Sequence, residues 1–153
     1  MPSEFIQRQK DDFFRDITSF GSLWFYAIFM IFFLILSDYS SLKVLLSGFI
    51  LMYFAVIMIR SAYFKNRPIR YNYNTAIEKL DASSFPSLHA SRTAFLAVFF
   101  IEYFSNTSAS ALLAVLALTV LYSRTYLKKH DWKDVLAGVV LGILAYFAVG
   151  YIL

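Results

Sequence analysis

Long apolar stretches separated by short polar segments dominate this chain. Each stretch is close to the length of about 20 residues with which a helix crosses the hydrocarbon core of a bilayer. Because backbone groups in lipid must find hydrogen-bond partners within their own segment, helices are the expected structure. The pattern therefore predicts an all-α integral membrane helical bundle, a single domain over residues 1–153, with about five transmembrane helices at residues 21–37, 42–59, 87–104, 109–122 and 135–153.

The N-terminal segment, residues 1–20, has a different pattern. Ile6, Phe13, Ile17 and Phe20 recur at helical spacing, with charged residues around the rest of the helical wheel. The segment lacks the central apolar run of a cleavable signal peptide. Two interpretations fit this pattern: an amphipathic helix lying in the membrane interface, or a helical tail docked on its own protein.

The composition indicates that lipid covers much of this protein. Of its 153 residues, 59% are hydrophobic and 20% are aromatic, and the mean hydropathy is +0.61. A soluble chain of this length cannot hide so many apolar side chains in one core. The absence of cysteine excludes a disulfide framework, a thiol nucleophile and a thiolate-held metal.

Positive charges gather on one side of the predicted topology. With five crossings, the N-terminal segment and the loops at residues 60–86 and 123–134 share one face, and of the 14 Lys and Arg residues only Lys43 clearly belongs to the other. Cytoplasmic loops carry such an excess of positive charge. We therefore expect a multi-pass protein of the cell membrane whose loop-rich face is cytoplasmic.

Three polar blocks on that face contain both histidines of the chain. The first block has Arg60 and Arg67-Pro68, directly after the second apolar stretch. Guanidinium groups bind phosphate oxygens bidentately and stay charged at any working pH. The alternative is that both arginines are ordinary interfacial cations that extend to the lipid headgroups.

The second block, Pro86-Ser87-Leu88-His89, lies at the start of the third apolar stretch. Free amide groups at a helix N-terminus bind anions, and a serine hydroxyl adds a further hydrogen bond. His89 is a candidate general acid, because the pKa of histidine lies near neutrality. The alternative is an N-cap serine followed by a histidine that fills a gap.

The third block places Arg124, His130 and Asp134 around the start of the last apolar stretch. A carboxylate near one imidazole nitrogen fixes the tautomer and leaves the other nitrogen able to attack an electrophile. An arginine there stabilises the charge on a transferring phosphoryl group. The alternative is a polar loop with an aspartate that caps a helix.

Together the blocks resemble the motifs of the membrane-bound type-2 phosphatidic acid phosphatase family, whose active site is related to that of the vanadium haloperoxidases. The family shows Lys-x6-Arg-Pro, then Pro-Ser-Gly-His, then Ser-Arg-x5-His-x3-Asp. This chain has corresponding residues in the same order: Arg60 and Arg67-Pro68, then Pro86-Ser87-Leu88-His89, then Ser123-Arg124, His130 and Asp134. The resemblance covers residues 60–138. The chain departs from the family in Arg60 for lysine, in Leu88 for glycine, and in five predicted spans for six.

The resemblance implies a role for each of these residues. His130 would be the nucleophile that forms a phospho-histidine, Asp134 would orient it, and His89 would be the acid for the leaving group. No metal and no cofactor are expected. The phosphate would be bound by Arg60, Arg67, Ser87, Arg124 and the backbone amide of Leu88, with Arg92 and Lys65 as further candidates around the site.

The expected function is that of a metal-independent lipid phosphatase that hydrolyses a lipid phosphomonoester or a polyprenyl diphosphate. Two alternatives stay open: a lipid phosphotransferase with the same pocket, and a non-catalytic lipid-binding or transport protein. The expected partners are the lipid phosphate substrate and membrane lipids, with no nucleic acid. The sequence makes no prediction of oligomeric state.

Overall fold

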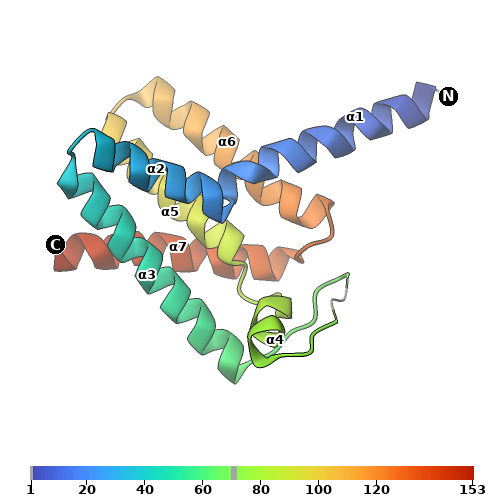
Figure 1. The fold of residues 1–153 in the computed structure, drawn as a ribbon. Coiled ribbons are helices and arrows are strands. Elements are labelled where there is room, and N and C mark those ends of the chain that lie inside the picture. Colours follow the sequence, from blue (N-terminus) through green and yellow to red (C-terminus); the bar gives the residue numbers. More distant parts are fainter. Residues whose placement is uncertain (1, 70–71) are drawn as a thin grey trace.

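The computed structural model describes residues 2–69 and 72–153, and their regular structure is entirely helical (Figure 1). This confirms the predicted all-α fold class. The elements are α1 (Pro2–Ile17), the short 3-10 helix η1 (Thr18–Gly21), α2 (Leu23–Ile35), α3 (Tyr39–Ala62), α4 (Ala76–Ala82), α5 (Leu88–Phe104), α6 (Thr107–Tyr126) and α7 (Trp132–Ile152).

The helices are those of a membrane protein, with fewer full-length spans than the five predicted. Among the described residues, α3, α6 and α7 are long and apolar enough to cross a bilayer, and residues 4–35 qualify as a fourth span if the bent pair of α1–η1 and α2 counts as one. The other two predicted spans form shorter helices: α2 has 13 residues and α5 has 17.

Polar residues between the apolar stretches start the helices. At each of these starts a side-chain oxygen accepts a hydrogen bond from a backbone amide in the first turn, which satisfies one of the four amides that a helix N-terminus leaves unpaired. The capping residues are Ser22, Asp38, Thr75, Ser87, Asn106 and Asp131. Single polar residues thus divide one long apolar sequence into separate helices.

The central helix of the bundle is α5, which makes its most extensive contact with α7 (Figure 1). Two glycines of α7 make this close approach possible. A Cβ on Gly138 would collide with the carbonyl oxygen of Ser87, and a Cβ on Gly142 would collide with that of Ser91. Small residues at a helix interface let two backbones approach closely in a membrane protein. The start of α5 is therefore held directly against the start of α7.

An aromatic core holds α5 on its other side. Tyr26 and Phe33 of α2 are fully buried and pack against Phe95 and Phe99 of α5. The Tyr26 hydroxyl donates to the carbonyl oxygen of Leu45 at 2.8 Å, so the buried phenol is satisfied. This core positions α5 relative to α2 and α3, and Leu88 of the second block packs against it.

The predicted N-terminal helix is present as α1, and part of it packs on the protein. The Phe14 and Tyr126 rings lie 4.2 Å apart, and the Tyr126 hydroxyl donates to the Asp11 carboxylate at 2.7 Å. The N-terminal end of α1 extends away from the bundle (Figure 1). Phe5 and Ile6 there are more than half exposed. The interpretation as a docked helix therefore fits the second half of α1, and an interfacial position for the first half stays a prediction.

Candidate active site

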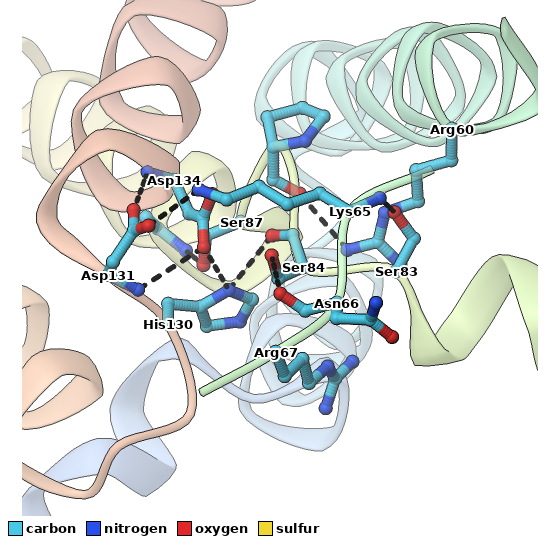
Figure 2. Close-up of polar contacts among 12 residues, drawn as sticks. Arg60, Lys65, Asn66, Arg67, Ser83, Ser84, Ser87, His130, Asp131 and Asp134 are labelled. Atoms are coloured by element: carbon cyan, nitrogen blue, oxygen red, sulfur yellow. Dashed lines mark hydrogen bonds and ion pairs between the residues drawn. The ribbon is translucent and has the colours of Figure 1, made fainter. Parts of the chain in front are cut away.

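His130 lies in the turn between α6 and α7 and is buried, with 4% of its surface exposed. Its Nδ1 is 2.9 Å from the carbonyl oxygen of Ser84 and 3.8 Å from the Asp134 carboxylate (Figure 2). A carbonyl oxygen can only accept a hydrogen bond, so Nδ1 carries the proton. Nε2 therefore keeps its lone pair, which is the state that a nucleophilic imidazole needs.

The charges around His130 favour its neutral form. Burial lowers the pKa of His130, the charges of Arg124 and Arg67 lower it further, and the hydrogen bond with Asp134 opposes them. The net effect is a pKa below the ordinary value of 6.5. The two arginines named by the sequence motifs are thus close enough to His130 to act on its charge, and the imidazole is neutral at pH 7.

Asp134 is fully buried and is shared between His130 and a lysine. Lys65 Nζ lies 2.6 Å from Asp134 and 2.6 Å from Asp131, so it bridges the two carboxylates (Figure 2). Burial opposes the charge of Lys65, but its hydrogen bonds to the two carboxylates outweigh this and raise the pKa of the lysine. Lys65, predicted only as a candidate around the site, neutralises the carboxylate that lies beside His130.

Ser84 connects the loop after α3 to this histidine. Its backbone amide donates to the Lys65 carbonyl oxygen at 2.8 Å, and its hydroxyl donates to the Asn66 carbonyl oxygen at 3.2 Å (Figure 2). Its own carbonyl oxygen accepts from His130. Sequence reasoning missed Ser84, although it lies only two residues before Pro86. Its contact with His130 is through the backbone carbonyl, which every residue type has, so the residue type does not indicate this role.

The two arginines of the first block take different positions. Arg60 is 8% exposed, and its terminal nitrogens donate to the carbonyl oxygens of Leu80 at 2.9 Å and Pro86 at 3.0 Å. Arg60 thus braces the segment that leads into α5, and its contact with phosphate stays a prediction. Arg67 lies on the loop after α3 and is drawn below the His130 ring in Figure 2. Its guanidinium donates a hydrogen bond to the Asp81 carbonyl oxygen.

The second block forms the N-terminus of α5. Ser87 is fully buried, and its hydroxyl accepts from the Ala90 amide at 3.3 Å, so the serine is an N-cap. The Ser87 amide donates to the Asp134 carbonyl oxygen at 3.0 Å, which joins the second block to the third. Leu88, the residue that replaces the family's glycine, begins α5 and is half-buried.

His89 and Arg124 both contact a residue that sequence reasoning did not select. His89 Nε2 lies 2.6 Å from the carbonyl oxygen of Thr18, in η1. Arg124 Nη1 donates to the Thr18 hydroxyl at 2.9 Å. Arg92, one turn after His89, is buried and donates to the Gly21 carbonyl oxygen at 3.1 Å and to the Tyr53 hydroxyl at 2.8 Å. Arg92 therefore supports η1 rather than contacting the His130 cluster.

An apolar groove of about 170 Å³ starts beside these residues. Its lining includes Thr93, one helical turn after His89, and Val120, one turn before Arg124. The groove runs between α2, α5 and α6, and its further lining is apolar: Phe20, Phe25, Phe29, Leu96, Ala97, Phe100, Leu113, Leu116 and Ala117.

Comparison with known protein families identifies a match. A model of the PAP2 superfamily matches residues 42–153, which include all three sequence blocks and exclude α1, η1 and α2. Neither a search of curated proteins nor a search of solved structures found a match.

Proposed function

Because the chain belongs to the PAP2 superfamily, whose members are generally phosphatases acting on phosphate esters, we propose that it is a metal-independent lipid phosphatase that works through a phospho-histidine. The substrate is a lipid phosphomonoester or a polyprenyl diphosphate. The observation that carries the proposal is the hydrogen bond from His130 Nδ1 to the Ser84 carbonyl oxygen, which leaves Nε2 as the attacking atom.

In the first step, His130 Nε2 attacks phosphorus and the bond from phosphorus to the leaving oxygen breaks. The ring then carries a positive charge, which the buried Asp134 carboxylate and the Ser84 carbonyl oxygen stabilise. Arg67 and Arg124 stabilise the charge on the phosphoryl oxygens. Both guanidinium groups already act on the pKa of His130, which supports this placement.

The leaving oxygen takes a proton from His89, which acts in its imidazolium form, so that a neutral imidazole is left after the first step. Water then attacks the phosphorus of the phospho-histidine, His89 accepts a proton from that water, and inorganic phosphate and neutral His130 are released. The same imidazole therefore acts as acid in the first step and as base in the second. Ser87 and the amide of Leu88 bind the phosphate at the N-terminus of α5, where the helix dipole favours an anion.

The apolar groove supports a lipid as the substrate. Two of its lining residues, Thr93 and Val120, are each one helical turn from His89 or Arg124, and apart from Thr93 the lining is hydrocarbon and aromatic. A lipid whose phosphate reaches His130 would leave its chain next to this groove, where the chain buries apolar surface against Phe20 and Phe100. By the distribution of positive charge, we place the site on the cytoplasmic face of the cell membrane.

The test is phosphate release by the purified protein in detergent, with EDTA present, over a panel of lipid phosphomonoesters and polyprenyl diphosphates. Release by the wild type that disappears in His130→Ala is the expected result. Lys79→Ala, an exposed residue of α4, is the control and should keep full activity. Full activity in His130→Ala would refute the phospho-histidine mechanism, and activity lost with EDTA but restored by a divalent cation would refute metal independence.

The alternatives give different results in the same assay. A phosphotransferase would consume the lipid phosphate and form a new phosphate ester with an added alcohol, without releasing inorganic phosphate in proportion. A lipid-binding protein would bind the lipid phosphate and leave it intact. Either result would replace hydrolysis as the function of this site.

The lipid class is tested by filling the groove. Ala117→Phe adds a ring inside the groove, whereas Ala114→Phe makes the same change on the exposed side of the same helix. Ala117→Phe should slow hydrolysis of long-chain substrates and leave a short, water-soluble phosphate ester unaffected. Equal loss on both substrate types would refute the groove as the chain site.

A further inference from the structure

The short helix η1 (Thr18–Gly21) contacts two of the proposed site residues although it lies outside the part of the chain that the superfamily model matches. Its contacts to His89 and Arg124 join residues 71 and 106 positions apart in the sequence. A segment that the superfamily match does not include thus meets the catalytic centre.

Thr18 contacts both residues through different atoms. Its carbonyl oxygen lies 2.6 Å from His89 Nε2, and because a carbonyl oxygen only accepts, Nε2 carries a proton. Its hydroxyl oxygen accepts from Arg124 Nη1 at 2.9 Å and lies 3.4 Å from His89 Nε2. Thr18 therefore contacts both the protonated nitrogen of His89 and the guanidinium of Arg124.

The rest of η1 is anchored to α5. Arg92, which is 7% exposed, donates through Nε to the Gly21 carbonyl oxygen and through Nη1 to the Tyr53 hydroxyl. Gly21 is fully packed: a Cβ there would collide with the His89 ring and with the Thr93 hydroxyl. Since a buried arginine and a tight glycine contact both hold η1 in place, the segment is a fixed wall of the site rather than a removable cover.

We propose that Thr18 is a positioning residue of the active site, whose hydroxyl aims the Arg124 guanidinium at the phosphoryl group beside His89. This proposal rests on the proposed function, because it assigns Arg124 and His89 to the phosphate and to the leaving oxygen. The substrate phosphate binds next to Thr18 and does not displace it.

The experiment compares Thr18→Val, which removes only the hydroxyl, with Thr18→Ser, which keeps it. A hydrogen bond to a charged group contributes enough that its loss should lower kcat by about 10-fold to 100-fold. KM should change little, since the effect is on the transition state. Thr18→Ser should stay near the wild-type rate, and the melting temperature of both variants should match that of the wild type.

A double-mutant cycle separates positioning from a general structural role. In an Arg124→Gln background the Thr18 hydroxyl has no guanidinium to aim, so Thr18→Val should cause little further loss. Equal losses in both backgrounds, an unchanged rate in Thr18→Val, or a faster rate in Thr18→Val would each overturn the proposal. The last result would mean that the hydroxyl obstructs the phosphate site.

Orthovanadate binding distinguishes failure of this proposal from failure of the proposed function. If the wild type releases phosphate and Thr18→Val is equally active, the positioning role fails and the phosphatase stands. If the wild type releases no phosphate, the phosphatase proposal fails, and the dissociation constant of orthovanadate decides the role of Thr18. Weaker orthovanadate binding by Thr18→Val, restored in Thr18→Ser, would support the proposal that Thr18 positions Arg124. Unchanged binding by Thr18→Val, or no binding by the wild type, would overturn that proposal.

Discussion

Gly138→Ala tests whether the contact between α5 and α7 builds the active site. The added methyl carbon would lie 2.9 Å from the Ala90 Cβ and would also collide with the carbonyl oxygen of Ser87. Carbon atoms pack at about 3.5–4.0 Å, so the two helices must separate locally by about 0.6 Å or more. Both neighbours belong to the first turn of α5 or its cap, where rotation of a flexible side chain cannot relieve the collision.

The size of the effect follows from this displacement. The Ser87 amide now donates to the Asp134 carbonyl oxygen at 3.0 Å. A separation of this size would stretch that bond to about 3.6 Å, beyond hydrogen-bonding distance. Overpacking of this kind costs about 1–3 kcal/mol. Because misplacement of a catalytic group by about 1 Å can cost about 100-fold in rate, we expect phosphate release to fall by about 10-fold or more.

The assay is the melting temperature in detergent together with the rate of phosphate release. Gly150→Ala is the matched control, because it makes the same substitution in the same helix where nothing lies within 4 Å of the new Cβ. Both variants gain the same helix propensity, about 1 kcal/mol, so the difference between them isolates the collision. If Gly138→Ala is as stable and as active as Gly150→Ala, the close approach of α5 and α7 does not position the site.

Three further predictions concern the charges of the site. Because burial and the neighbouring arginines lower the pKa of His130, the neutral nucleophile persists below pH 6.5; the pH-rate profile should keep its activity through that value and lose it only at lower pH. Arg60→Lys restores the residue type of the family but keeps at most one of the two carbonyl contacts. The free energy of unfolding should therefore fall by about 1 kcal/mol, which a lower melting temperature would show. Lys65→Met leaves the buried Asp134 without its closest cation and should lower both the melting temperature and the rate, whereas Lys65→Arg should retain part of each; an unchanged Lys65→Met would contradict the bridging role.

The fold class and the helix starts could be predicted from local sequence patterns. Polar residues such as Ser87 and Asp131 cap the helices next to them, and that interaction depends only on residues a few positions apart. The number of full spans was less predictable, since α5 carries an apolar sequence of nearly the right length but is largely surrounded by protein. The hydropathy of a segment indicates that its residues prefer an apolar environment, but it does not distinguish lipid from a neighbouring helix.

The site was predicted as a set of residues, and the structure shows how they meet. His130, Asp134, Arg67 and Arg124 do gather in one place. The partners of Arg60 are backbone carbonyls, which no motif records. In the same way, the oxygen that fixes the His130 tautomer is a carbonyl, while the predicted carboxylate lies farther away, at 3.8 Å.

The sequence by itself determined that this protein is a bundle of apolar helices, and it predicted a site of two histidines and several arginines, because hydropathy, capping and motif spacing are local properties of the chain. Only the tertiary structure decided that Thr18 contacts His89 and Arg124, and that Lys65 neutralises Asp134. These contacts join residues 69 to 106 positions apart. They exist because glycines let α7 approach α5 closely and a buried arginine anchors η1 to α5, and both depend on how the helices pack.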